Sequence, residues 1–364
     1  MDNAFLIADY CEKKLINKIG DFEKYSYKEP CFIFTLIRPE KLSERQKEYF
    51  QKVNFLLMYQ RIRNDIITKE IADIFNNRNN LVGIKGIFLQ NIYYNKNYTR
   101  LFGDIDLLTV AENGYKEYRV LRNSGYTLIK NSHYFENNHF TISLLREKYF
   151  SNACHIELIK KIDGKEKIVL ELHGNLNRCN SGNVSFNVGK MLARAKKVEI
   201  GNSIIKILSP EDNIAYLMFH SIKHLSYTSF IRAQNKTLNL QDFYDIVQII
   251  DNETIDWDLF LNIVCEFKIL PFVSLYIKIF TDIFDNKIPQ NIVNAIHKKT
   301  AQSHFFWKPI YDMVIVLSPD KIITGNFCDI PFLDSIYNNA KNSSTPVKVW
   351  HDFCARQQEL TIKS

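Results

Sequence analysis

Apolar side chains recur every three or four residues along much of this chain, a spacing typical of amphipathic helices. The longest such stretch, residues 43–75, predicts one long helix or two. Between about residues 81 and 173 short apolar or alternating runs predict strands instead. The helical spacing returns from about residue 208. The pattern predicts an α+β protein in three parts: a helical N-terminal segment (1–76), a core that contains the strands (77–205) and a helical C-terminal domain (206–364).

The C-terminal domain begins with a strong helix start. Ser209 is a good N-cap, Pro210 suits the first helical position, and two acidic residues follow in the first turn. The spacing after this start predicts a buried face made of Ile214, Leu217, Met218 and Ile222. A neighbouring polar face is expected to carry Tyr216, His220, Lys223 and Tyr227.

Two β-rich runs, residues 154–160 and 167–173, flank Asp163-Gly164, a dipeptide that indicates a hairpin. If these two residues form the whole turn, Glu157 pairs with Leu170, and Glu157 and Glu171 face opposite ways. The second run then has an apolar face of Ile168, Leu170 and Leu172, and a face with Val169, Glu171 and His173. Glu171 is therefore the better candidate for a functional carboxylate. Glu157 takes its place if the register is shifted by one residue.

The stretch LFGDIDLLTV holds the clearest candidate chemistry. Residues 105–110 read as a short buried strand entered through Gly103, so that Asp104 and Asp106 share one face. Two neighbouring carboxylates repel each other unless a cation neutralises them or one is protonated. Oxygen ligands favour a hard divalent cation such as Mg²⁺. The competing interpretation is that this aspartate pair only caps a turn and a strand.

Composition sets limits on the class of protein. With 364 residues, 46% of them hydrophobic, the chain is long enough for two or three packed units. Seven cysteines without a CxxC pair indicate a reduced, cytoplasmic protein, with neither a disulfide framework nor a zinc ribbon. The sequence predicts no signal peptide and no membrane span. A formal charge of +7 suits anionic ligands but is spread along the chain.

Several short runs of the chain belong to one pattern: IKG (84–86), Arg100, GDIDLLT (103–109), LELH (170–173), LSPED (208–212) and HSIKH (220–224). Together they resemble the uncharacterised nucleotidyltransferase family within the DNA polymerase β-like superfamily. The resemblance covers residues 81–247, and GDIDLL is its most specific part. There are two departures: Gly174 stands where the family's ELHW has tryptophan, and Lys85-Gly86 stands where the superfamily usually has a Gly-Gly or Gly-Ser turn.

The resemblance implies a nucleotidyltransferase-like core with a mixed β-sheet and a reaction that needs two Mg²⁺ or Mn²⁺ ions and an NTP. Asp104 and Asp106 would bridge the ions, and Glu171 would complete the one that activates the nucleophile. The competing interpretation of Lys85 is a solvated loop residue. The competing interpretation of Arg100 is a structural partner of Asp104 or Asp106. His220 and His224 are expected on a helix surface or in the core. The nucleotide-binding residues implied are Lys85, Gly86, Arg100, Gly103 and Lys223.

The sequence gives less direct information on the acceptor, the molecule that would receive the nucleotide. The mild net charge and the lack of a basic, aromatic stripe in the sequence favour a hydroxyl or similar group of a small molecule or peptide. The end of an RNA or tRNA is the alternative acceptor. A protein that binds nucleotide without catalysis is the alternative from a different functional class, and the intact acidic residues argue against it.

Overall fold

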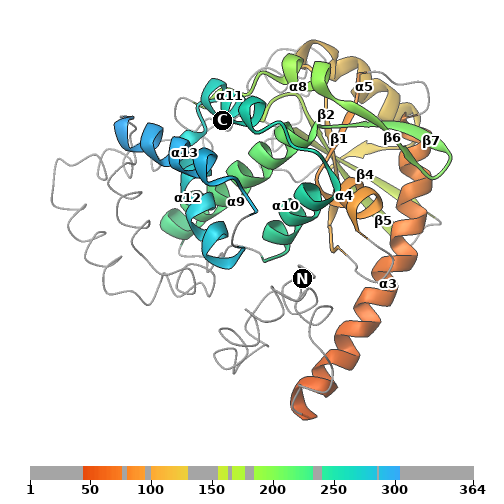
Figure 1. Ribbon diagram of the computed structural model, residues 1–364. Helices are drawn as coiled ribbons and strands as arrows, with labels where there is room; N and C mark the ends of the chain where they lie inside the picture. The colour runs from red at the N-terminus through yellow and green to blue at the C-terminus, as the bar shows by residue number, and fades with distance from the viewer. Residues whose placement is uncertain are drawn as a thin grey trace. The chain divides into compact units, whose positions relative to one another are not determined.

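The computed structural model describes residues 44–75, 80–94, 100–129, 155–162, 166–176, 184–232, 240–284 and 287–303. The chain divides into two compact units, whose helices and strands are labelled in Figure 1. The first unit spans Glu44–Asn213 and contains all the described strands. The described elements of the second unit, within Ile214–Ser364, are helices. Among the described helices, none has both the length and the apolar composition needed to cross a bilayer.

A seven-stranded mixed sheet organises the first unit. Its strands are β1 (Val82–Ile84), β2 (Asp104–Leu108), β3 (Thr127–Leu128), β4 (His155–Ile162), β5 (Glu166–His173), β6 (Lys196–Ile200) and β7 (Ser203–Ile207). They lie in the order β3-β4-β5-β2-β1-β7-β6. The central strand β2 is parallel to β5 and antiparallel to β1. β1 and β7 are parallel, whereas β4–β5 and β6–β7 are antiparallel hairpins.

The helices of this unit are α3 (Glu44–Phe75), α4 (Gly86–Tyr93), α5 (Ala111–Asn123) and α8 (Val188–Arg194). α3 is a single helix of 32 residues that contacts β7 and α4. The unit ends where α9 (Pro210–Arg232) begins, and the Ser209 hydroxyl accepts a hydrogen bond from the Asp212 N–H at 3.2 Å. Arg194 donates to both oxygens of the buried Asp212 carboxylate, at 2.8 and 2.7 Å. The predicted helix start at Ser209-Pro210 is therefore correct.

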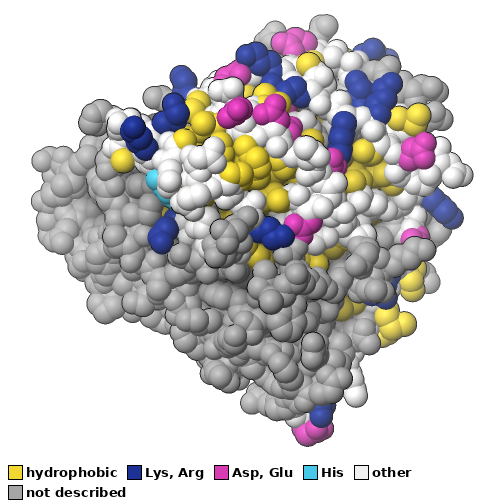
Figure 2. All heavy atoms as spheres, in the orientation of Figure 1, with side chains coloured by type: hydrophobic (Ala, Val, Ile, Leu, Met, Phe, Trp, Pro, Cys, Tyr) yellow, Lys and Arg dark blue, Asp and Glu magenta, His cyan; other side chains and the backbone are white. Residues whose placement is uncertain are grey.

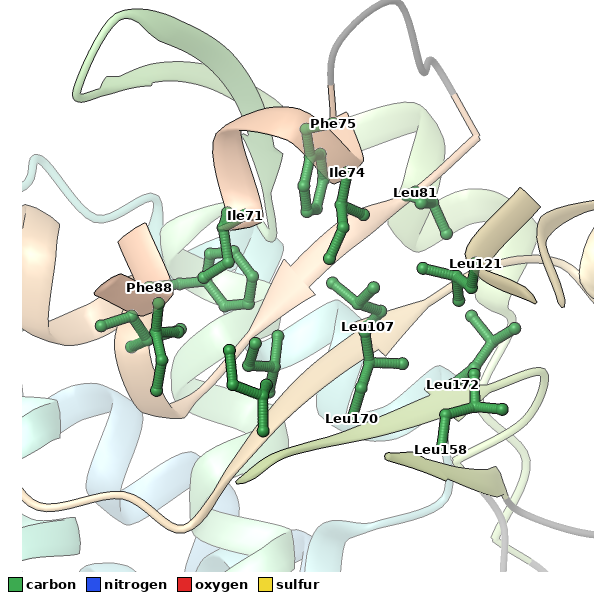
Figure 3. Packing of buried hydrophobic residues seen from close by; sticks show 14 of the residues in the cluster. Ile71, Ile74, Phe75, Leu81, Phe88, Leu107, Leu121, Leu158, Leu170 and Leu172 are labelled. Atoms are coloured by element: carbon green, nitrogen blue, oxygen red, sulfur yellow. The ribbon is translucent and has the colours of Figure 1, made fainter. Parts of the chain in front are cut away.

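The two faces of the sheet have different chemistry. Ile105 and Leu107 of β2 and Ile168, Leu170 and Leu172 of β5 point to one face and are buried. α3 and α5 cover that face with Ile71, Ile74, Phe75 and Leu121, and Figure 3 shows these side chains packed together. Burial of each such side chain contributes about 1.5–3 kcal/mol. Because strand side chains alternate, Asp104, Asp106 and Glu171 lie on the opposite face.

The second unit packs α9 with α10 (Leu240–Asn252), α11 (Trp257–Glu266), α12 (Leu270–Ile283) and α13 (Gln290–Gln302). The rings of Phe243 and Tyr276 stack with centroids 4.6 Å apart, which joins α10 to α12. The Ser221 hydroxyl donates to Asp242 Oδ2 at 3.1 Å and so links α9 to α10. Ile214, Leu217, Met218 and Ile222 are buried, as their spacing predicts.

The predicted α+β class, with a mixed sheet, an N-terminal helix and a helical C-terminal part, is confirmed. The single helix α3 settles the choice between one helix and two, and β2 begins at Asp104 rather than Ile105. Tyr216 was expected on a polar face but is only 2% exposed, because α9 is packed on that side as well. The three-part division at residues 76 and 205 stays a prediction. Helices before residue 44, strands near His133–Thr141 and the side chains of Lys223, His224 and Tyr227 fall outside the described residues.

The hairpin register predicted from a two-residue turn is wrong. Glu157 lies directly opposite Glu171, not Leu170, and the last pair is Ile162 with Glu166. The connection therefore has three residues, Asp163 to Lys165, which shifts the register by one. As a result Glu157 and Glu171 share a face, and the facing argument does not separate them.

Gly83 of β1 is a test of how closely this core is packed. A Cβ at Gly83 would lie 2.4 Å from the ring of Phe88, which is 1% exposed. We expect Gly83→Ala to destabilise the protein by about 1–3 kcal/mol through overpacking. Gly189→Ala is the matched control, because its Cβ would meet only Asn187 Oδ1 at 3.5 Å, within helix α8. There alanine should stabilise the protein by about 0.5–1 kcal/mol. Urea unfolding followed by circular dichroism should shift in opposite directions, and equal shifts would contradict this packing.

Candidate active site

Three carboxylates meet on the face of the central strands that lies opposite the hydrophobic core. Asp104 and Asp106 lie two residues apart on β2, and the parallel pairing with β5 sets Asp106 beside Glu171. Ligand oxygens of the three residues all lie within 4.8 Å of one another. Their burial differs: Asp106 is 2% exposed, whereas Asp104 and Glu171 are half-buried. This oxygen-only donor set suits a hard divalent cation.

Asp106 is the most constrained of the three. Its Oδ1 lies 3.0 Å from the Lys85 Nζ and 3.1 Å from the His173 Nε2. Burial by itself would raise the pKa of Asp106, but Lys85 and the hydrogen bond from His173 outweigh it and hold that pKa below its ordinary value. Burial lowers the pKa of His173, but its hydrogen bonds to Asp106 and Glu171 raise that pKa by more, so the net change is an increase. The carboxylate is thus ionised and neutralised by two neighbours.

The turn before α4 brings Lys85 to this site. Lys85 has φ 57° and Gly86 has φ 46°, both in the left-handed region that only glycine adopts without cost. For a lysine this conformation costs on the order of 1–3 kcal/mol. A Cβ on Gly86 would lie 3.3 Å from the Asp104 carbonyl oxygen, so the turn packs directly against the start of β2. Backbone N–H groups at the start of a helix suit an anion, as the implied phosphate contact requires.

Two histidines complete the polar face of the β4–β5 hairpin. The His173 Nε2 lies 3.2 Å from Glu171 Oε2, and the His155 Nε2 lies 3.8 Å from Glu171 Oε1 and 3.5 Å from Glu157 Oε1. Burial opposes ionisation of Glu171, but His173 and His155 lower its pKa well below the ordinary value. Burial and the neighbouring Glu171 raise the pKa of Glu157. Of the two glutamates, Glu171 is therefore the one whose pKa is lowered, and it is the one that lies beside Asp106 on the neighbouring strand.

Arg63 of α3 fixes the chain just before the aspartates. Its guanidinium donates to the carbonyl oxygens of Phe102 at 3.4 Å, Gly103 at 3.5 Å and Lys167 at 3.3 Å. It also lies 5.9 Å from the centre of the Phe102 ring. Because one side chain holds the entry of β2 and the start of β5 together, Arg63 is a positioning residue for the carboxylates of both strands.

The other sequence candidates lie at different places. Gly103 is exposed immediately before Asp104. Arg100 is 6% exposed, its N–H bonds to the Gln90 side chain, and its guanidinium donates to the Leu101 carbonyl at 3.3 Å. His220, in the second unit, is half-buried with its ring 5.6 Å from that of Tyr216. The structure thus brings Lys85 and Gly86 to the three carboxylates, with Arg100 and Gly103 on the segment that enters β2.

Sequence reasoning assigned no role to His155, His173 or Arg63. The signal for the histidines was present, since strand alternation puts His173 on the face of Glu171. With the correct register, His-x-Glu on β4 opposes Glu-x-His on β5. Arg63 has no comparable signal, because its partners are backbone carbonyls far along the chain.

Comparison with known proteins gives one family and a distant structural likeness. The family described as "Uncharacterised nucleotidyltransferase" matches residues 37–285. No curated protein matches. Among solved structures, one that matches is a crystal structure of an antigenic nucleotidyltransferase-like protein from Paracoccidioides brasiliensis. It has 11% identity, covers 70% of this chain and 93% of its own, and has a TM-score of 0.32.

Removal of the lysine tests the neutralisation of Asp106. We expect Lys85→Met to lower the free energy of unfolding by about 3–5 kcal/mol, because it leaves a buried carboxylate without one of its cations. Adding Asp106→Asn should recover much of that loss. Lys47→Met is the control: Lys47 pairs with Glu44 at 2.6 Å on the exposed surface of α3, where a pair contributes about 0–1 kcal/mol. Additive effects of Lys85→Met and Asp106→Asn in chemical denaturation would contradict the coupling.

Proposed function

Because this chain belongs to the uncharacterised nucleotidyltransferase family, we propose that it transfers a nucleoside monophosphate from an NTP to an acceptor group in a metal-dependent reaction. The observation that carries the proposal is the meeting of Asp104, Asp106 and Glu171 on adjacent parallel strands. Three carboxylates at this spacing repel one another strongly. Divalent cations would relieve that repulsion, which gives the arrangement a chemical purpose.

The proposed roles follow from position and burial. Asp104 and Asp106 would hold two Mg²⁺ or Mn²⁺ ions, and Glu171 would complete the site nearest the attacking hydroxyl. When bound, such ions neutralise phosphate charge and lower the pKa of the attacking hydroxyl. Glu171, whose pKa is held low, is well suited to accept the hydrogen bond of that hydroxyl and orient it. Before metal binds, Lys85 and His173 hold the Asp106 carboxylate in place.

The triphosphate is proposed to lie along the Lys85-Gly86 turn. Gly86 has no side chain, which lets the turn pack directly against the Asp104 backbone. The backbone N–H groups at the start of α4 would then bind phosphate oxygens. Lys85 would supply positive charge. Release of its ammonium from Asp106 would accompany metal binding, since both cations neutralise the same carboxylate. The proposed nucleotide-binding set is Lys85, Gly86, Arg100, Gly103 and Lys223.

The wider relationship is also part of the proposal. We assign the core to the DNA polymerase β-like superfamily, because an aspartate pair on one strand and an acidic residue on its parallel neighbour match the arrangement implied by GDIDLL and ELH. The divisions proposed are a helical segment over 1–76, the catalytic core over 77–205 and a helical domain over 206–364.

The proposed acceptor is a hydroxyl or similar group on a small molecule or peptide. On the face shown in Figure 2, Lys and Arg side chains of the described residues lie in separate small groups among hydrophobic and acidic ones. A groove for a nucleic-acid strand would need a continuous basic track. Transfer to an RNA or tRNA end is the second candidate acceptor. Incubation with each labelled NTP and Mg²⁺ in a cell extract should reveal which class of molecule gains a nucleotide.

The metal requirement can be tested by calorimetry. NTP binding should require Mg²⁺ or Mn²⁺ and be lost in Asp104→Ala/Asp106→Ala, because no oxygen pair remains on β2 to hold the ions. The folded state should survive, since relief of carboxylate repulsion offsets lost contacts. Asp65→Ala/Asp73→Ala is the matched control, because it removes two exposed carboxylates of α3 in the same unit. Undiminished metal-dependent binding in the site variant would refute the proposal.

A second test separates binding from chemistry. Glu171→Gln should retain much of the nucleotide binding, which depends on Asp104 and Asp106, yet lose about 10²–10³-fold in transfer rate. Glu157→Gln should have the smaller effect, because β4 is one strand farther from β2. Single-turnover kinetics with a labelled NTP would measure both. A larger loss of rate in Glu157→Gln would transfer the role to Glu157.

A further inference from the structure

The polar face of the β4–β5 hairpin carries a block of four ionisable side chains. His155 lies directly opposite His173, and Glu157 lies directly opposite Glu171. The two imidazole centroids are 5.0 Å apart. Since all four residues come from regular, hydrogen-bonded strands, their spacing is set by the sheet rather than by a loop.

The Nε2 atoms of both imidazoles lie near Glu171, and each also lies near a second carboxylate: His173 Nε2 is 3.1 Å from Asp106 Oδ1, and His155 Nε2 is 3.5 Å from Glu157 Oε1. A metal ion bound to His173 Nε2 would replace the hydrogen bond between that nitrogen and Asp106. The Nε2 atoms of His173 and His155 lie 3.2 and 3.8 Å from the two oxygens of Glu171. One ligand atom from each of the three residues lies within 4.8 Å of the others. Ligands of a tetrahedral ion with bonds near 2.1 Å are about 3.4 Å apart. Small rotations of the half-buried His155 and Glu171 side chains would reach that spacing.

The local charge is suited to a cation at this point. Four acidic residues, Asp104, Asp106, Glu157 and Glu171, lie on neighbouring strands, and the cationic groups in contact with them are Lys85 and the two histidines. A divalent ion bound to the imidazoles would take over the neutralising role of their protons. Two ions held only by oxygen would suit Mg²⁺. Two imidazole nitrogens and one carboxylate oxygen form a different donor set, which suits borderline transition-metal ions such as Zn²⁺ or Ni²⁺.

We propose that His155, His173 and Glu171 bind a borderline divalent transition-metal ion of the Zn²⁺ class, beside the position of Asp104 and Asp106. The inference rests on the proposed function only through Glu171, which both sites share. An ion held by the histidines would draw Glu171 away from the aspartate side. The hairpin site would therefore make the enzyme responsive to the kind of divalent metal available, with Zn²⁺-type ions competing for a ligand of the Mg²⁺ site.

The test uses Co²⁺ as a spectroscopic probe for the whole chain without nucleotide. Each imidazole bound to Co²⁺ gives a strongly shifted exchangeable N–H proton signal, so that the wild-type protein should give two. His155→Ala should give at most one and weaken Co²⁺ binding by roughly 10- to 100-fold or more. His155→Gln, which keeps more of the side-chain volume, serves if the alanine variant does not fold. Asp104→Asn removes an aspartate ligand but leaves the hairpin intact, and should keep both signals.

The outcomes separate the two proposals. The hairpin site is supported if both N–H signals remain in Asp104→Asn and at most one remains in the His155 variants. Co²⁺ binding with no shifted N–H signal, abolished by Asp104→Asn, overturns the hairpin site and leaves the nucleotidyltransferase proposal standing. Unchanged signals in both His155 variants also overturn it. Failure of every variant and the wild type to bind Co²⁺, together with failure to bind Mg²⁺ and NTP, overturns both.

Discussion

A buried negative charge at the centre of the sheet is the constraint on which the other features depend. Asp106 is on the middle strand and 2% exposed, so its carboxylate must be neutralised within the protein. The ammonium of Lys85, a residue with a positive φ, lies against the Asp106 carboxylate. The imidazole of His173 bonds to the same carboxylate from the neighbouring strand β5. The turn before α4 and the end of β5 are thus tied to one carboxyl group.

Much of the fold follows from the spacing of apolar residues, because alternation in a strand and the 3.6-residue repeat of a helix are local properties. The same alternation correctly separated the Ile168, Leu170 and Leu172 face from the face of Glu171 and His173. It could not fix how β4 pairs with β5, since the register depends on whether Lys165 belongs to the turn. A single residue there decides whether Glu157 and Glu171 share a face.

The site was predictable only in part for a related reason. Asp104 and Asp106 can be recognised as a pair from the sequence, because they lie two residues apart on one predicted strand. The resemblance implied Glu171 as the third carboxylate, but the parallel pairing of β2 with β5 that brings it to the aspartates was not predicted from the sequence. The hydrogen bonds from Arg63 could not be predicted from the sequence, because its guanidinium binds main-chain carbonyls and any residue type can supply a carbonyl.

The parallel pairing of β2 with β5 also bears on how the chain folds. Asp106 and His173, which share a hydrogen bond, are 67 residues apart in the sequence. The chain between them includes α5, β3 and β4. Contacts of such high sequence separation form after local ones, because the entropy of closing the loop opposes them. We therefore expect the carboxylates to come together late in folding, when β2 pairs with β5. A partly folded chain would have two separate acidic strands and no shared cation site, so the proposed metal binding would require the finished domain.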